Sequence, residues 1–121
     1  MNRSKPKLIY KVVDADQWSA AQQQGEFRGA AIDLQDGYIH FSTATQVPET
    51  VSKHFAGQPN LLLVGVDPQK LGDALRWERS RGGELFPHLY ANLSLNHVVS
   101  VTDLPIGKDG DHLFPDDLQG R

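Results

Sequence analysis

The chain contains no cysteine among its 121 residues. Disulfide bonds, thiolate nucleophiles and thiolate-bound metal ions are therefore excluded as the basis of its structure or chemistry. The sequence also lacks any apolar run approaching the roughly 20 residues that cross a bilayer, and its beginning lacks the apolar stretch of a signal peptide. These absences predict a cytoplasmic protein with no membrane partner.

An excess of positive charge is absent as well. The net charge is −3 at pH 7, so the composition does not indicate a nucleic-acid partner. Apolar residues make up 39% and charged residues 22% of the chain, which is typical of an ordinary globular domain. We therefore predict a single domain over residues 1–121, with an ordered core at about 8–105. Residues 106–121, rich in glycine and charge without periodicity, are predicted to be a loose C-terminal tail.

Familiar catalytic and metal-binding motifs are missing too. The five histidines are dispersed, with no H-x-H or H-x-x-x-H pair, so no metal site is predicted. There is no G-x-S-x-G elbow for a serine hydrolase. Neither a G-x-x-x-x-G-K-[ST] loop nor a G-x-G-x-x-G turn is present to cradle phosphates.

The hydrophobic pattern that is present predicts more strands than helices. A helix after residue 14 is expected to have Asp14 or Asp16 as its N-cap and Gly25 as its stop, and a second is expected to begin at the cap Thr45. The stretch between them, residues 28–37, reads as loop and turn. Strands are expected at 8–13, 38–42, 60–67, 74–80, 88–93 and 96–105.

The run "NLLLVGVD" is almost continuously apolar, so we place it at the centre of the sheet. Its residues Leu61, Leu63, Val64 and Val66 are expected to be among the most buried. The whole pattern predicts the α+β class, with a twisted, mostly antiparallel sheet and a few short helices.

Polar residues in three of the predicted strands share a face, because side chains alternate along a strand. The first segment is "GYIHFSTATQ", the second "LRWERS" and the third "PHLYANL". The side chains that alternation groups, and that we expect to line a common cavity, are His40, Ser42, Arg76, Glu78, His88 and Tyr90.

Each of these residues also has a plainer interpretation. A lone strand histidine such as His40 is usually a hydrogen-bonded structural residue. Arg76 and Glu78 could be a solvent-facing pair, which contributes little to stability. Ser42 and Thr43 could simply bond the first turn of the following helix.

Four stretches together resemble the bacterial DUF952 family, a group of small proteins without established activity. They are "IYKVV" with the following tryptophan, "DGYIHFSTATQV", "LRWERSRGGELFPHLY" and "VVSVTDLP". The resemblance covers about Leu8 to Pro105. It implies a fold similar to that of ADP-ribosyltransferases, which grip NAD in a cleft between two small sheets.

The resemblance also implies roles for particular residues. His40 and Glu78 would be the catalytic residues, and the ligand-binding residues would be Ser42, Thr43, Arg76, His88 and Tyr90. No cofactor is otherwise implied, and NAD would be the substrate. One departure is evident: Glu78 precedes the loop "SRGGELFP", whereas such transferases typically carry the catalytic glutamate on a late strand, and the last strand here ends in Asp103 without one.

The implied chemistry is ionisation of the glycosidic bond of NAD, with a carboxylate such as Glu78 stabilising the oxocarbenium-like ribose. Arg76, Arg79 or Arg81 would bind the pyrophosphate through paired hydrogen bonds. Two other functions stay open: a non-catalytic binding module for a small anionic metabolite, and a structural or interaction domain. The amount of polarity on the grouped strands disfavours the structural domain.

Overall fold

The computed structural model describes residues 8–119 of the chain. Its elements in chain order are β1 (Ile9–Asp14), α1 (Ala15–Gln24), β2 (Glu26–Phe27), α2 (Ala31–Asp36), β3 (Ile39–His40), β4 (Ser42–Thr43), α3 (Val47–His54), β5 (Leu61–Val66), η1 (Pro68–Ala74), β6 (Leu75–Arg79), η2 (Arg81–Gly83), β7 (Leu85–Leu89), β8 (Leu93–Ser94), η3 (Leu95–His97), β9 (Val98–Leu104) and α4 (Asp116–Gln119).

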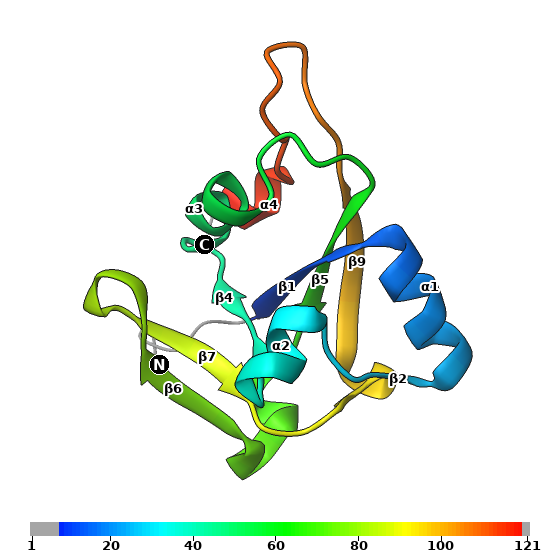
Figure 1. Ribbon diagram of the computed structural model, residues 1–121, viewed down its shortest axis with the longest axis vertical. Coiled ribbons are helices and arrows are strands. Elements are labelled where there is room, and N and C mark those ends of the chain that lie inside the picture. Colours follow the sequence, from blue (N-terminus) through cyan, green and yellow to red (C-terminus); the bar gives the residue numbers. More distant parts are fainter. Residues whose placement is uncertain (1–7, 120–121) are drawn as a thin grey trace.

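The main sheet has four strands in the order β4-β1-β5-β9, and every neighbouring pair is antiparallel. β5 lies between β1 and β9 (Figure 1), which confirms the central position predicted for it. Leu61, Leu63, Val64 and Val66 are each at most 2% exposed. The predicted α+β class with antiparallel sheets is therefore confirmed.

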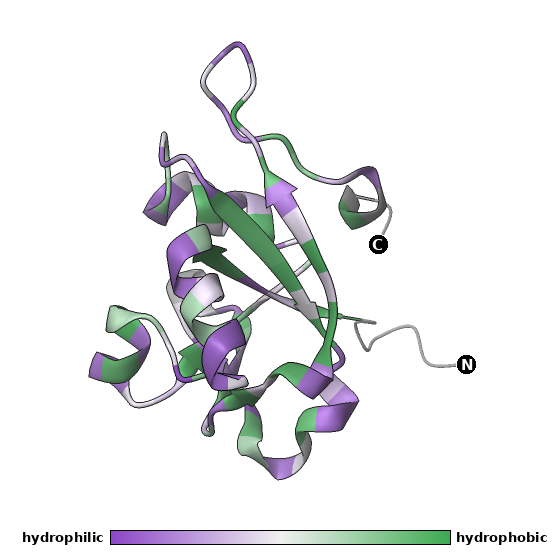
Figure 2. Ribbon diagram, turned by 90° about the vertical axis from the view of Figure 1, so that its right-hand side faces the viewer, coloured by the Kyte–Doolittle hydropathy of each residue, from purple (hydrophilic) through white to green (hydrophobic). Residues whose placement is uncertain are grey.

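Each face of this sheet packs against a separate apolar layer, because successive side chains of a strand point to opposite faces. One face packs against α1, β2 and the three-stranded sheet, through Trp18, Phe27 and Leu89. The other face packs against α3 and α4, through Val47 and Leu118. Figure 2 shows hydrophobic colour along the central strands, whereas the surrounding helices and loops carry a mixture of hydrophobic and hydrophilic colours. No helix within residues 8–119 is long and apolar enough to cross a membrane.

A three-stranded sheet in the order β3-β7-β6 stands beside the main sheet (Figure 1). The chain passes from one sheet to the other at Phe41, which separates β3 from β4 and whose N–H donates to the carbonyl of Pro87. Phe41 is 2% exposed and packs in the layer on the α1 side. A short ladder of β2 with β8 completes the sheets.

The ends of the two longer helices follow from local sequence. The carboxylate of Asp14 accepts from the backbone N–H of Gln17 and caps α1, and Gly25 ends that helix with φ of 82°. Both features are as predicted. Pro48 lies in the first turn of α3, where its missing N–H costs no hydrogen bond, but the cap is Gln46 rather than Thr45. The start of α3 was therefore predicted one residue too early.

The helix α2 was not predicted, since residues 28–37 read as loop and turn. Asp33 at its third position accepts from the backbone N–H of Ala30, and Gly37 closes the helix in the left-handed conformation. A helix of six residues is too short to be stable alone. The bond at its first turn and the glycine at its end define its length, and its stability comes from contacts with the rest of the fold.

The segment after residue 105 has more structure than the sequence predicts. Ile106 forms a β-bridge with His112, and the ring of His112 donates from Nε2 to the carbonyl of Gln58 at 2.7 Å. Leu118 of α4 is 3% exposed and packs against the α3 side of the main sheet. The described part of this segment thus closes one apolar layer.

Candidate functional site

A row of polar side chains crosses the face of the three-stranded sheet. His40 of β3 lies opposite His88 of β7, and His88 lies opposite Arg76 of β6. The ring centroids of the two histidines are 5.5 Å apart. Backbone pairing therefore brings together three of the residues that alternation had grouped, although they lie far apart in sequence.

Glu78 is held by two neighbours through one of its oxygens. The Nδ1–H of His88 donates to Oε1 at 2.7 Å, and the hydroxyl of Tyr90 donates to the same atom at 2.8 Å. The bond from His88 is the largest cause that lowers the pKa of Glu78 below its ordinary value. The same arrangement raises the pKa of Tyr90 through its bond to Glu78. Glu78 is thus a pre-oriented, ionised carboxylate at neutral pH, with Oε2 left outside these bonds.

Tyr38 lies at the centre of the aromatic side chains on this face. Its ring stacks on His88 with centroids 4.2 Å apart, and its centroid is 4.6 Å from His40 and 5.1 Å from Tyr90. Burial raises the pKa of the Tyr38 phenol, with further contributions from the charges of Asp36 and Glu78. We call Tyr38, His40, Arg76, Glu78, His88 and Tyr90 the histidine patch.

Of the three arginines that could bind a pyrophosphate, Arg76 belongs to the histidine patch. Its guanidinium carbon lies 5.0 Å from the ring centroid of Tyr90, which is a cation–π distance. Arg79 lies three positions after Arg76 in β6, so the two side chains point to opposite faces of the strand. Arg79 donates to the carbonyl of Gly83 in the hairpin turn. The side chain of Arg81 lies outside the described parts of the structure.

His40 is anchored by carboxylates on both ring nitrogens. Nδ1 lies 2.6 Å from Oδ1 of Asp33, and Nε2 lies 3.0 Å from Oδ2 of Asp36. Ionised carboxylates accept but cannot donate, so in each of these hydrogen bonds the ring nitrogen is the donor. The backbone N–H of His40 also donates to Asp33. Asp33 itself is bound by Lys11, whose Nζ lies 2.8 Å from Oδ2.

Lys11 and Asp33 form a buried ion pair beneath the patch, 6% and 2% exposed. Burial alone would raise the pKa of Asp33, but the bond from His40 and the charge of Lys11 outweigh it and lower the value to about 2. Burial lowers the pKa of Lys11, and Asp33 opposes that change. Asp33 is therefore ionised at neutral pH, and Lys11 is its ion-pair partner.

The two hydroxyl residues predicted for ligand binding, Ser42 and Thr43, have local hydrogen-bond partners. The Oγ of Ser42 lies 3.0 Å from Oγ1 of Thr50 in α3, and Ser42 is buried. Thr43 contacts Thr45 through its hydroxyl, and its N–H donates to the side chain of Gln46. The alternation that grouped Ser42 with His40 breaks at Phe41, where the chain changes sheets. The plainer interpretation, bonding to the following turn and helix, describes these contacts.

Sequence reasoning did not name Tyr38, Lys11, Asp33 or Asp36 as candidates. Tyr38 shares the face of His40 by the alternation already used. Lys11 gave a signal as well, because a lysine within "LIYKVV" breaks an apolar strand run. Asp33 gave no such signal, since an aspartate in a predicted loop is unremarkable.

The patch is partly open to solvent rather than enclosed. The side chains of His40 and Glu78 are 31% and 36% exposed, while His88 lies buried beneath them. Two shallow hollows of about 400 and 270 Å³ lie against other elements, the larger between α3 and residues 110–114. Within residues 8–119, no three or more of the histidine, aspartate and glutamate side chains are grouped so as to hold a metal ion.

Comparison with known proteins identifies the family. The model of a family described as "Protein of unknown function (DUF952)" matches residues 12–101. The crystal structure of protein CC0527 from Caulobacter crescentus is 46% identical, with a TM-score of 0.88 over 93% of this chain and 98% of that one. The solution NMR structure of CC0527 is 45% identical, with a TM-score of 0.83 over 95% and 99%. No curated protein matches. The chain is a member of the DUF952 family.

Proposed function

We propose that the histidine patch binds NAD or a related nucleotide, in an arrangement like that of ADP-ribosyltransferases. The observation that supports this most is Glu78, an ionised carboxylate held through one oxygen by His88 and Tyr90. Such a group can accept from a ribose hydroxyl through its other oxygen. It can also stabilise the positive charge that builds on a ribose as its glycosidic bond breaks.

The neighbours of Glu78 supply the remaining contacts of this proposal. The exposed side of the Tyr38 and Tyr90 rings offers an aromatic surface for a planar base or nicotinamide. Arg76 is exposed beside Tyr90 and can pair with a phosphate oxygen. His40, fixed at Nδ1, can orient a ligand oxygen from Nε2 if Asp36 moves aside. Catalysis, where it occurs, would then rest on positioning and charge.

A second candidate is a non-catalytic module that binds a small anionic metabolite. It is favoured by the local bonding of Ser42 and Thr43, whose hydroxyls already have partners within the chain. It is also favoured by β9, which ends in Asp103 and Leu104 and carries no glutamate. Both candidates use Arg76 and His40, and they differ in whether Glu78 has a catalytic role.

Calorimetry with NAD and ADP-ribose tests the proposal on the wild-type protein and on His40→Ala. We expect the substitution to weaken binding by about 1–3 kcal/mol, because it removes an oriented hydrogen bond from a partly buried site. His97→Ala is the matched control, since His97 lies in η3 outside the patch. Equal affinities for wild type and His40→Ala would remove His40 from the site.

The Glu78→Gln variant separates the two candidates when release of nicotinamide from NAD is measured alongside the calorimetric binding of ADP-ribose. A transferase should lose release of nicotinamide from NAD while still binding ADP-ribose, since the glutamine keeps the shape but not the charge of the side chain. A binding module should release no nicotinamide even as wild type. Absence of binding of both ligands to the wild-type protein would contradict the nucleotide proposal.

A further inference from the structure

We infer that Lys11 and Asp33 are positioning residues, a buried ion pair of the main sheet and α2 that fixes the ring of His40 within the histidine patch. Neither residue faces the ligand side of the patch, because Lys11 and Asp33 are 6% and 2% exposed. They act through His40. The consequence for ligand binding rests on the proposed function, whereas the hold on the ring does not.

The carboxylate of Asp33 gathers groups from three parts of the chain. Its Oδ1 accepts from the ring Nδ1 of His40 at 2.6 Å and from the backbone N–H of His40 at 3.1 Å. Its Oδ2 accepts from the backbone N–H of Ala30 at 2.8 Å. Lys11 Nζ lies 3.0 Å from Oδ1 and 2.8 Å from Oδ2. Both the backbone and the ring of His40 are therefore set by one side chain.

The position of Asp33 is itself constrained from the other side. Gly29 has φ of +121°, and a Cβ placed on it would lie 2.9 Å from the Cβ of Asp33. A side chain at residue 29 would thus push Asp33 away or strain the backbone. Asp33 also closes the first turn of α2 through Ala30. The missing side chain at Gly29 and the bond to Ala30 therefore both help to place the Asp33 carboxylate beneath His40.

Lys11 provides the opposite charge from a strand of the main sheet. It lies on β1, paired with Val64 of the central strand, and its neighbours on that face are the fully buried Ile9 and Val13. An apolar residue would fit this environment without the cost of removing a charge from water, and replacing buried ion pairs by apolar residues is often neutral or stabilising. Stability alone therefore does not explain the lysine. Holding the Asp33 carboxylate in place beneath His40 does, because Lys11 Nζ contacts both of its oxygens.

The test is an NMR measurement on the ligand-free protein, because it reads the hold on the ring directly. The Nδ1–H of His40, bonded to a buried carboxylate, should exchange slowly with water and give a separate downfield signal that His40→Ala removes. We expect Lys11→Met and Asp33→Asn to lose or strongly shift this signal, and Lys11→Arg to restore it because the charge is kept. Lys53→Met is the matched control, since Lys53 forms an exposed ion pair with Glu49.

Backbone amide spectra of the same samples establish that each variant is folded. If Lys11→Met does not fold, Asp33→Asn and Lys11→Arg still decide the matter. A His40 signal that is unchanged in a folded Asp33→Asn variant would overturn the inference.

Binding of ADP-ribose provides the second readout and separates the two proposals. We expect Lys11→Met and Asp33→Asn to bind about tenfold more weakly, or worse, and Lys53→Met to bind like wild type. Equal binding by variants that have lost the His40 signal would overturn the positioning role. If the wild-type protein itself does not bind ADP-ribose, the proposed function fails while the NMR result still decides how His40 is held.

Discussion

Replacing Asp33 by Ala is expected to lower the free energy of unfolding by about 3–5 kcal/mol, the range for removing one partner of a buried ion pair. The substitution leaves Lys11 buried without an opposite charge. It also removes the acceptor for His40 and for the first turn of α2. Urea unfolding at pH 7 measures the effect. Asp73→Ala is the control, because Asp73 is exposed in η1.

The effect should depend on pH in a defined direction. The pKa of Asp33 in the folded protein is about 2, below its ordinary value of 3.8. A carboxylate whose pKa is lowered by folding stabilises the protein above its unfolded value, and this contribution is lost as pH falls. The difference between wild type and Asp33→Ala should therefore shrink between about pH 4 and pH 2. A loss as small as that of Asp73→Ala at pH 7, or a difference that grows on acidification, would contradict this account.

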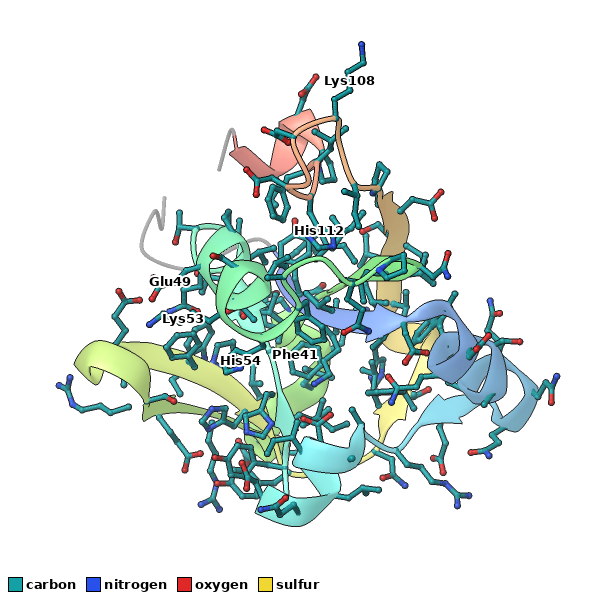
Figure 3. All side chains as sticks on the ribbon, turned by 45° about the horizontal axis from the view of Figure 1, so that its top comes forward. Phe41, Glu49, Lys53, His54, Lys108 and His112 are labelled. Carbon is teal, nitrogen blue, oxygen red and sulfur yellow. The ribbon has the colours of Figure 1, made fainter. Side chains whose placement is uncertain are left out.

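Replacing Phe41 by Ala is expected to cost about 3–5 kcal/mol of unfolding free energy, as for other fully buried aromatic side chains. Phe41 is 2% exposed and packs among Ile9, Val66 and Leu89, where the main and three-stranded sheets meet. Figure 3 shows it near the centre of the molecule, with Glu49 and Lys53 at the periphery. Removing the ring would leave a cavity in a closely packed layer.

Urea unfolding of Phe41→Ala and Phe55→Ala measures this effect and its control. Phe55 is partly buried at the end of α3 and should cost clearly less. Because β3 continues directly into Phe41, amide signals of His40 and His88 should also shift in Phe41→Ala. A cost equal to that of Phe55→Ala would show that the joint between the sheets is not a packing centre.

The main sheet could be predicted from the sequence because its signal is local. A continuous apolar run such as Leu61–Val66 requires burial on both faces, and only a central strand offers that. Asp14 and Gly25 mark the ends of α1 by the same kind of short-range chemistry. The helix α2 could not be predicted from local sequence because a tertiary contact supports it. Asp33 is bound by Lys11, which lies 22 positions away in the chain.

In the candidate site, too, local features could be predicted from the sequence and tertiary contacts could not. Period-two alternation is a property of one strand, and Arg76 and Glu78 do lie two positions apart within β6. Tyr90 lies just beyond the end of β7, and it meets His88 through their shared bonds to Glu78. Alternation misplaced Ser42 because the rule assumes an unbroken strand, and the chain changes sheets at Phe41. Which segments pair with one another is a property of the whole fold. The contacts between His40 and Asp33 therefore could not be inferred from periodicity.

An amide-detected NMR titration of the wild-type protein with NAD and with ADP-ribose tests the central claim most directly, because it locates the ligand without assuming a reaction. The account predicts that the largest shifts belong to Tyr38, His40, Glu78 and Tyr90. Arg76 should shift with both ligands, since each carries a pyrophosphate. Shifts confined to the hollow between α3 and residues 110–114 (His112 in Figure 3), or no shifts with either ligand, would contradict it.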